Sequence, residues 1–179
     1  FALEIGKRGT VFGQEWEVVG ALRRKDQITI WQEFLLFNPY LGYRWLVVAD
    51  GEWQFGTPLA DRPQGDRNRV FWRGDSFNRL GRDQPTSTTL VAGEFYWRVK
   101  AGDTANATLF QSGETILSRE VSDGEENWTQ LVPVSETEIE NAFGLNRRSL
   151  PRRKAAQGWM QFKAAPGMEQ DDLGRMFLL

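Results

Sequence analysis

Apolar and polar residues alternate over most of the chain up to residue 134, the period expected of half-buried β-strands. In the segment Glu15–Gly20, for example, Trp16 and Val18 share one face and glutamates occupy the other. Three segments rich in aromatic and β-branched residues follow, and Asp50-Gly51 between the last two is a strong hairpin signal. The segments that we predict to form this three-stranded meander are Ile28–Phe37, Tyr43–Ala49 and Glu52–Phe55.

A second group of strand-like segments follows an irregular, charged region. Asp61–Asp83 contains six arginines and four aspartates, which predicts an exposed excursion with local ion pairs around a short strand at Val70–Arg73. Asp123-Gly124 is a second clear turn. The later predicted strands are Thr86–Val91, Glu94–Lys100, Ala107–Phe110, Glu114–Val121 and Asn127–Val134.

One helix is predicted, at Glu136–Phe143. Ser135 can cap its first turn, Glu138 completes a capping box, and Gly144 ends it. The segment 146–179 contains prolines, glycines and a basic run, so we predict a basic linker or tail, and residues 1–145 form the β-rich domain.

The two halves carry tryptophans in similar strand–turn–strand blocks. Glu15–Gly20 is similar to Phe95–Gly102, and Trp31–Leu35 to Leu117–Val121. We predict a mainly β fold of antiparallel sheets, either a sandwich or paired partial barrels, with one short helix near residues 136–143. An internal duplication would place repeat units at 4–56 and 86–134.

The amino-acid composition excludes several kinds of function. The chain has 179 residues, 40% hydrophobic and 26% charged, which is a globular balance. Its net charge of −2 argues against nucleic-acid binding. The absence of cysteine and histidine excludes disulfides, cysteine-based zinc sites, and triads or acid–base chemistry that need these side chains. We expect no cofactor and no metal ligand set.

Carboxylates beside strand residues are the candidates for catalysis. Glu33, Glu94 and Glu120 could supply a pair of acids, as in glycoside hydrolysis. The alternative, which we favour, is that each is a strand carboxylate paired with one of the 17 arginines. An enzyme predicts that these acids converge in an open cleft without arginine partners, whereas a scaffold predicts that each is buried and paired.

Tryptophans are the candidates for ligand binding. Alternation predicts that most of them are core residues: Trp16, Trp31, Trp45, Trp53, Trp97 and Trp128. Trp72 and Trp159 lie outside the regular pattern and are expected to be exposed, which makes them weak ligand-binding candidates. An acidic stretch at Glu114–Glu140 beside aromatic residues would suit a polyamine or another small cation.

A basic run follows the predicted helix and consists of Arg147, Arg148, Arg152, Arg153 and Lys154. It could contact an anionic lipid surface, or it could be a solvated arm paired with the acidic stretch. Because the chain starts at Phe1 and ends in the apolar run Met176–Leu179, we expect it to be part of a longer protein.

An ordered set of motifs resembles one known family. The motifs are Gly6, Gly9, Gly13, Trp16-x-Val18-x-Gly20, Trp31-x-Glu33-x-x-Leu36, Trp45-Leu46, Gly51-x-Trp53, Gly93-Glu94-Phe95-x-Trp97-x-Val99-x-x-Gly102-Asp103, Leu117-Ser118-x-Glu120, Trp128 and Ala142-Phe143-Gly144-Leu145. Together they resemble the bacterial domain-of-unknown-function family DUF4178 over about residues 4–145. The chain departs from the family pattern at Gln111–Ile116, where members often carry a proline- and aromatic-rich stretch, and in the arginine-rich excursion.

The resemblance implies a cellular context for the chain but no chemical activity. Family members are encoded near phage-shock-type membrane-stress proteins and polyamine-synthesis enzymes, and some carry zinc ribbons or membrane segments. We therefore expect a non-enzymatic interaction or scaffold module with protein partners, cytoplasmic, and membrane-associated only through segments outside this chain. The alternatives are a carboxylate-based, hydrolase-like enzyme and a polyamine or small-cation binding module.

Overall fold

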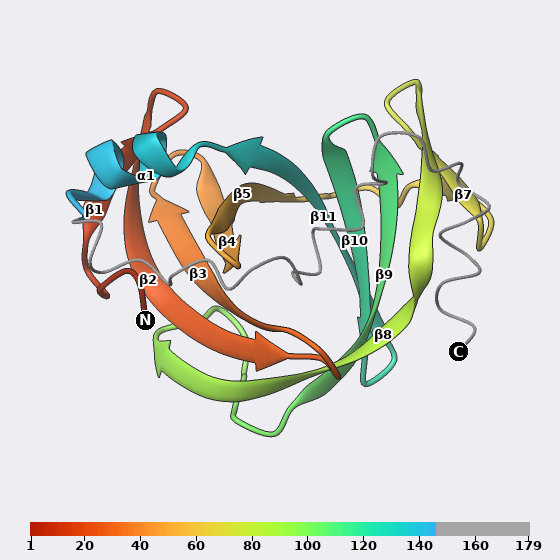
Figure 1. Cartoon of the computed structure of the whole chain (residues 1–179), viewed down its shortest axis with the longest axis horizontal. Coiled ribbons are helices and arrows are strands. Elements are labelled where there is room, and N and C mark those ends of the chain that lie inside the picture. The colour runs from red at the N-terminus through yellow and green to blue at the C-terminus, as the bar shows by residue number, and fades with distance from the viewer. Residues whose placement is uncertain (146–179) are drawn as a thin grey trace.

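Eight antiparallel strands close into a single barrel in the computed structural model, which describes residues 1–145 (Figure 1). Neighbouring strands in the ring are hydrogen-bonded, and β2 pairs with both β3 and β8, which closes it. In ring order the strands are β2 (Gln14–Lys25), β3 (Ile30–Asn38), β4 (Gly42–Ala49), β5 (Glu52–Pro58), β11 (Glu125–Val134), β10 (Thr115–Ser122), β9 (Thr104–Ser112) and β8 (Asp75–Gly93).

Two four-stranded meanders, β2–β5 and β8–β11, make up this ring. Their first strands pair from Gly20↔Gly93 to Lys25↔Ser87, and their last strands pair from Thr129↔Pro58 to Val134↔Trp53. The prediction of a mainly β fold with one short helix is confirmed. The finer prediction of a sandwich or paired partial barrels is wrong, because hydrogen bonds join both pairs of edges and leave one continuous sheet.

The meanders share their turn chemistry. Four two-residue hairpin turns have both central residues at positive φ, the geometry that matches strand twist. They lie before the first strand of each meander, at Phe12-Gly13 and Arg73-Gly74, and before the last strand, at Asp50-Gly51 and Asp123-Gly124. In topology, β2–β5 therefore correspond to β8–β11.

The strand correspondence predicted from sequence is different, and it is wrong. Glu15–Gly20 lies in β2, but the similar segment Phe95–Gly102 is not a strand, because residues 94–103 form the loop between β8 and β9. Trp31–Leu35 lies in β3 and Leu117–Val121 in β10, which are the second and third strands of their meanders. The predicted strand Glu94–Lys100 is corrected for the same reason: Gly93, at φ 79°, takes the chain out of the ladder.

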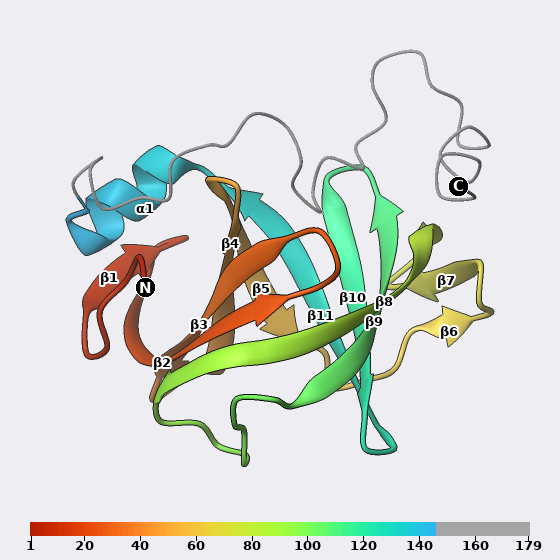
Figure 2. The ribbon, with the colours of Figure 1, turned by 60° about the horizontal axis from the view of Figure 1, so that its bottom comes forward.

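Additional elements cover the outer face of each meander (Figure 2). The strand β1 (Arg8–Val11) and the helix α1 (Glu136–Phe143) pack on β2–β5 and bury Phe34, Leu36 and Trp53 in an outer core. On the other meander, β6 (Gln64–Gly65) and β7 (Arg69–Trp72) belong to the predicted excursion, and β7 covers a smaller core that contains Phe110 and Leu117.

The helix has the predicted bounds. The Ser135 side chain accepts a hydrogen bond from the Glu138 amide, and Gly144 ends the helix in the left-handed conformation. The Glu138 carboxylate instead accepts from the Phe12 amide at 3.0 Å, so it joins the helix to the β1–β2 turn. No helix within residues 1–145 combines the length and apolar character needed to cross a membrane.

Candidate functional site

A cavity of about 840 Å³ lies inside the barrel. It is bounded by residues of β2, β3, β4 and β8–β11, by the β8–β9 loop, and by residues 58–62 at the end of β5 and after it. The apolar part of the interior is a cluster of buried side chains around Trp31, Val47 and Leu131, with Trp45 and Leu109 packed against it. The polar part of the wall is formed by residues of β2, β3, β8, β10 and β11.

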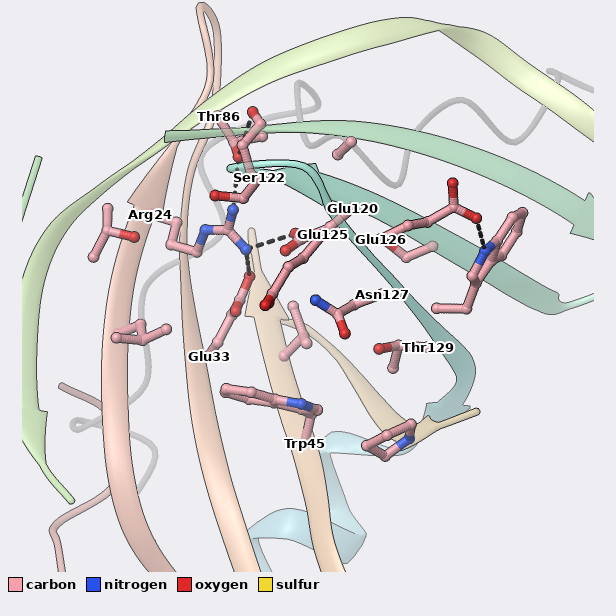
Figure 3. A pocket seen from close by; sticks show the side chains of 18 of the residues that line it. Arg24, Glu33, Trp45, Thr86, Glu120, Ser122, Glu125, Glu126, Asn127 and Thr129 are labelled. Carbon is pink, nitrogen blue, oxygen red and sulfur yellow. Dashed lines mark hydrogen bonds and ion pairs between the residues drawn. The ribbon is translucent and has the colours of Figure 1, made fainter. Parts of the chain in front are cut away.

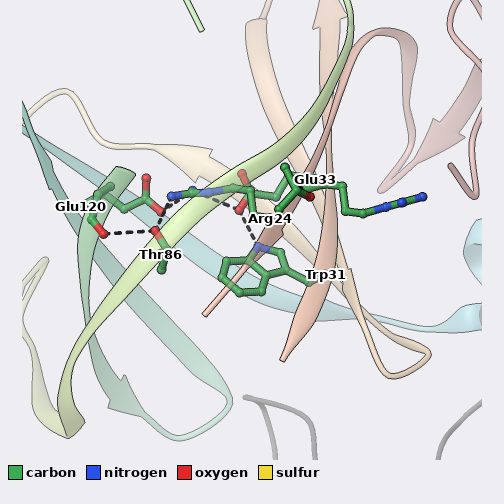
Figure 4. Close-up of polar contacts among 8 residues, drawn as sticks. Arg24, Trp31, Glu33, Thr86 and Glu120 are labelled. Atoms are coloured by element: carbon green, nitrogen blue, oxygen red, sulfur yellow. Dashed lines mark hydrogen bonds and ion pairs between the residues drawn. The ribbon is translucent and has the colours of Figure 1, made fainter. Parts of the chain in front are cut away.

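Arg24 is the centre of the polar wall (Figure 4). Its guanidinium contacts Glu33 of β3 at 3.2 Å and Glu120 of β10 at 2.6 Å, and it donates to the Thr86 hydroxyl of β8 at 2.7 Å. The Trp31 indole donates to the same Glu33 carboxylate at 2.7 Å, and Arg24 lies over the Trp31 ring at 5.8 Å. One cation therefore joins four strands of the closed barrel.

Burial and charge act against each other at this cluster. Only 8% of the Arg24 side chain and 12% of the Glu33 side chain are exposed. Burial raises the pKa of Glu33, because the charged form loses hydration, and Arg24 opposes this only in part. Burial acts to lower the pKa of Arg24, but Glu33 and Glu120 outweigh it and hold that pKa above its ordinary value.

Carboxylates outnumber cations around the cavity. Three arginines line it: Arg24, Arg62 and Arg98. Eight acids line it: Asp26, Glu33, Asp61, Asp103, Glu120, Asp123, Glu125 and Glu126. The formal balance is five negative charges, which favours a cation in the cavity.

Adjacent glutamates of β11 differ in their surroundings (Figure 3). Glu126 accepts from Arg119 at 2.7 Å and from the Trp128 indole at 2.7 Å, and it pairs with Arg62 at 3.0 Å. The hydrogen bond from Arg119 leads the effects that lower the Glu126 pKa. The Glu125 side chain has no ion pair or hydrogen bond to another residue of the described chain, 1–145, although it lines the cavity. Glu125 is therefore one of the lining carboxylates that remain available to a ligand, together with Asp61 and Asp123.

An aromatic cluster borders the cavity where the β8–β9 loop lies. Trp97 of this loop contacts Trp45 of β4, with ring centroids 5.7 Å apart and planes at 62°. Tyr96 lies 4.5 Å from both Trp97 and Tyr43. The loop begins at a close approach of Gly93 to Gly20, where the Glu94 amide donates to the Val19 carbonyl.

The candidate acids separate into two groups. Glu33 and Glu120 converge on the cavity wall, nine and 96 residues respectively from their shared partner Arg24 in sequence. Glu94 is exposed and does not line the cavity. Trp72, expected to be exposed, is half-buried against the small outer core, while Trp159 and the basic residues 147–154 lie outside the described residues.

The predicted tryptophan core is confirmed at four positions: Trp16, Trp31, Trp53 and Trp128 are buried. It is wrong for Trp97, which is 37% exposed at the cavity border, and Trp45 is half-buried beside it. The two rings contact each other at the barrel opening, where Trp45 also packs against the edge of the interior cluster.

Arg24, Thr86 and Glu125 were not predicted to be site residues. Arg24 lies beyond the strand-like segment Glu15–Gly20 recognised in the sequence. In the structure β2 continues to Lys25, and a register shift between Val18 and Gly20 turns Gly20, Leu22 and Arg24 inward. The sequence did contain a signal for this position: Arg24 follows the apolar Leu22 by two residues, so the two side chains share one face of the strand. Within residues 1–145, no three acidic side chains are grouped so as to hold a metal ion.

Residues 4–135 match one family, described as a domain of unknown function (DUF4178). The curated proteins and the solved structures contain no significant match to the chain.

Proposed function

This chain belongs to the DUF4178 family of domains of unknown function, and we propose that its barrel is a non-enzymatic module that binds a small organic cation in the interior cavity. One observation carries the proposal: a partly open cavity is lined by eight carboxylates and three arginines, with tryptophans on its wall. Concave sites with aromatic walls and a few placed charges are typical of small-molecule binding. A cation would offset the excess of negative charge.

The pairing of the candidate acids supports binding over catalysis. A carboxylate that acts as an acid, base or nucleophile needs access to its substrate. Glu33 and Glu120 share Arg24 instead, and Glu33 also accepts from Trp31. These contacts fix the two carboxylates in the wall, so we assign them to the support of the cavity and assign ligand contact to Glu125.

The expectations about protein partners, an anionic membrane surface and a cytoplasmic location stay predictions. The basic residues on which the membrane hypothesis depends follow the described chain. Cation binding inside the barrel is compatible with an interaction module, because the exposed outer surface stays available to a partner.

The test is calorimetric titration of the full chain with spermidine. We expect saturable binding of one equivalent that weakens with added salt. Glu125→Gln should weaken it about fivefold, the effect of removing one favourable charge contact of about 1 kcal/mol. Glu52→Gln is the matched control, because Glu52 also follows an Asp-Gly turn and begins a strand but does not line the cavity. Absence of saturation, or equal weakening by both variants, would refute the proposal.

A further inference from the structure

The geometry points to a cation–π subsite at the barrel opening, formed by Trp45 and Trp97 and favouring an alkylated ammonium group over a bare one. This inference rests on the proposed function and specifies the class of cation. It concerns the aromatic part of the cavity border, where two indole rings from separate elements meet.

The Trp45 and Trp97 rings at the cavity border have no arginine of the described chain over them. Arginines lie over four other aromatic rings of the described chain: Phe1, Trp16, Trp31 and Trp72, at 5.5–5.9 Å from their centroids. Within residues 1–145, none lies over Trp45 or Trp97, although both line the cavity and Arg98 is adjacent in sequence. No arginine of the described chain therefore competes with a ligand for the parts of the two indoles that border the cavity.

Other aromatic rings hold Trp97 in place. Phe95 contacts Trp97 at 5.0 Å in an edge-to-face arrangement, and Tyr96 lies 4.5 Å from it. Tyr96 is itself held against Tyr43 of β4. The loop ring is therefore fixed against a strand, so Trp97 and Trp45 present two walls at 62° before any ligand binds.

Charge complementarity selects the occupant. Figure 3 shows Trp45 on one side of the cavity, with Glu125, Asn127 and Thr129 around the space above it. Methyl groups on an ammonium spread its charge over an apolar surface, which suits ring faces and needs no hydrogen-bond acceptor. A bare ammonium instead loses hydration that ring faces do not replace. The nearby Glu125 carboxylate adds long-range attraction for either cation.

Three related probes separate the contributions: choline, ethanolamine, and dimethylbutanol, the uncharged carbon analogue of choline. Binding to the full chain is measured by calorimetry. We expect choline to bind about tenfold more tightly than ethanolamine, and dimethylbutanol to bind more weakly than both. Trp97→Leu should remove most of the preference for choline and leave the affinity for ethanolamine nearly unchanged.

Trp97 is the residue to change because it lies on an exposed loop, and Tyr40→Leu, at a 93% exposed position outside the cavity, is the control. Equal affinities for choline and ethanolamine, with spermidine still bound, would overturn the subsite and leave the proposed function intact. Equal binding of dimethylbutanol and choline would replace cation–π recognition by apolar burial. Failure of spermidine and both ammonium probes to bind would overturn the proposed function as well.

Discussion

Arg24 compensates the charge of two carboxylates inside the barrel, and they compensate its own. A carboxylate enclosed in an apolar interior is costly, and an arginine there is equally costly without a partner. Here one guanidinium meets Glu33, Glu120 and the Thr86 hydroxyl at 2.6–3.2 Å, so its charge is compensated from three strands. When both carboxylates are ionised, the two acids exceed the one base, and the net negative charge of the cluster contributes to the attraction of a cation.

The raised pKa of Glu33 predicts a pH dependence of stability. The folded protein retains a proton on Glu33 at pH values above the ordinary 4.5, where the unfolded chain has lost it. The folded state thus binds more protons, and the contribution of Glu33 to the free energy of unfolding falls as the pH rises from about 4.5 through the raised value. Glu33→Gln cannot titrate, so the stability of wild type relative to this variant should fall over the same interval.

Urea unfolding at several pH values between 4 and 8 measures this difference. Glu52→Gln controls for the loss of one negative charge from the molecule. A difference between wild type and Glu33→Gln that rises with pH would mean that Arg24 outweighs burial at Glu33, contrary to the assigned direction.

The positions of the site side chains could be predicted from the sequence only where apolar and polar residues alternate regularly. Glu33 follows Trp31 by two residues, which put it on the same face as a buried ring and made it a candidate. Its partner Arg24 is preceded by the irregularity at Val19, so counting by two from Trp16 places Arg24 on the wrong face. The contact between Glu120 and Arg24 spans 96 residues, and no local pattern encodes it.

At the scale of elements, turn chemistry and capping were the reliable signals. Asp50-Gly51 and Asp123-Gly124 end strands where predicted, and Ser135 and Gly144 bound the helix. Residues 94–100 were wrongly predicted to form a strand because Phe95, Tyr96 and Trp97 have high strand propensity. The Tyr96 and Trp97 rings pack against Tyr43 and Trp45, so tertiary contacts override the local preference.

Gly20 positions the β8–β9 loop, and we predict that Gly20→Ala displaces it. An added Cβ would lie 2.7 Å from the Glu94 carbonyl oxygen and 2.7 Å from the Phe95 ring. The loop must shift, at a cost of about 1–3 kcal/mol in stability, and Trp97 should move relative to Trp45. Indole N–H resonances in ¹H–¹⁵N NMR spectra report that movement.

Gly9→Ala is the control for this substitution. Its added Cβ would meet the Ala142 carbonyl oxygen at 2.5 Å, so it disturbs the packing of α1 on β1 and lowers stability. The indole resonances of Trp45 and Trp97 should stay in place in this variant. If they shift equally in both variants, Gly20 has no specific role at the barrel opening.

At the scale of the whole molecule, the barrel has one interior and two unequal outer cores. The first meander is covered by β1, α1 and the N-terminal residues, over a cluster of 15 buried side chains. The second is covered by β7 over a cluster of five. Closure of the ring could not be read from the sequence, because the joining pairs β2–β8 and β5–β11 link residues about 60–80 positions apart.

This asymmetry predicts the order of local opening in hydrogen exchange. Segments with few buried contacts open at low free energy, so amides of β6 and β7 should exchange at least about tenfold faster than those of β3 and β4. Barrel strands β9 and β10 should exchange at intermediate rates, since they contribute both to the small outer core and to the interior. Within residues 1–145, the Arg62–Glu126 pair is the one ion pair between the excursion and the barrel. Its arginine side chain is about two-thirds exposed, so the pair should add little protection. Mass spectrometry of peptic peptides resolves these segments. Protection of β7 equal to that of β4 would show that the two meanders unfold as one cooperative unit, and the size of the outer cores would then have no influence on the order of opening.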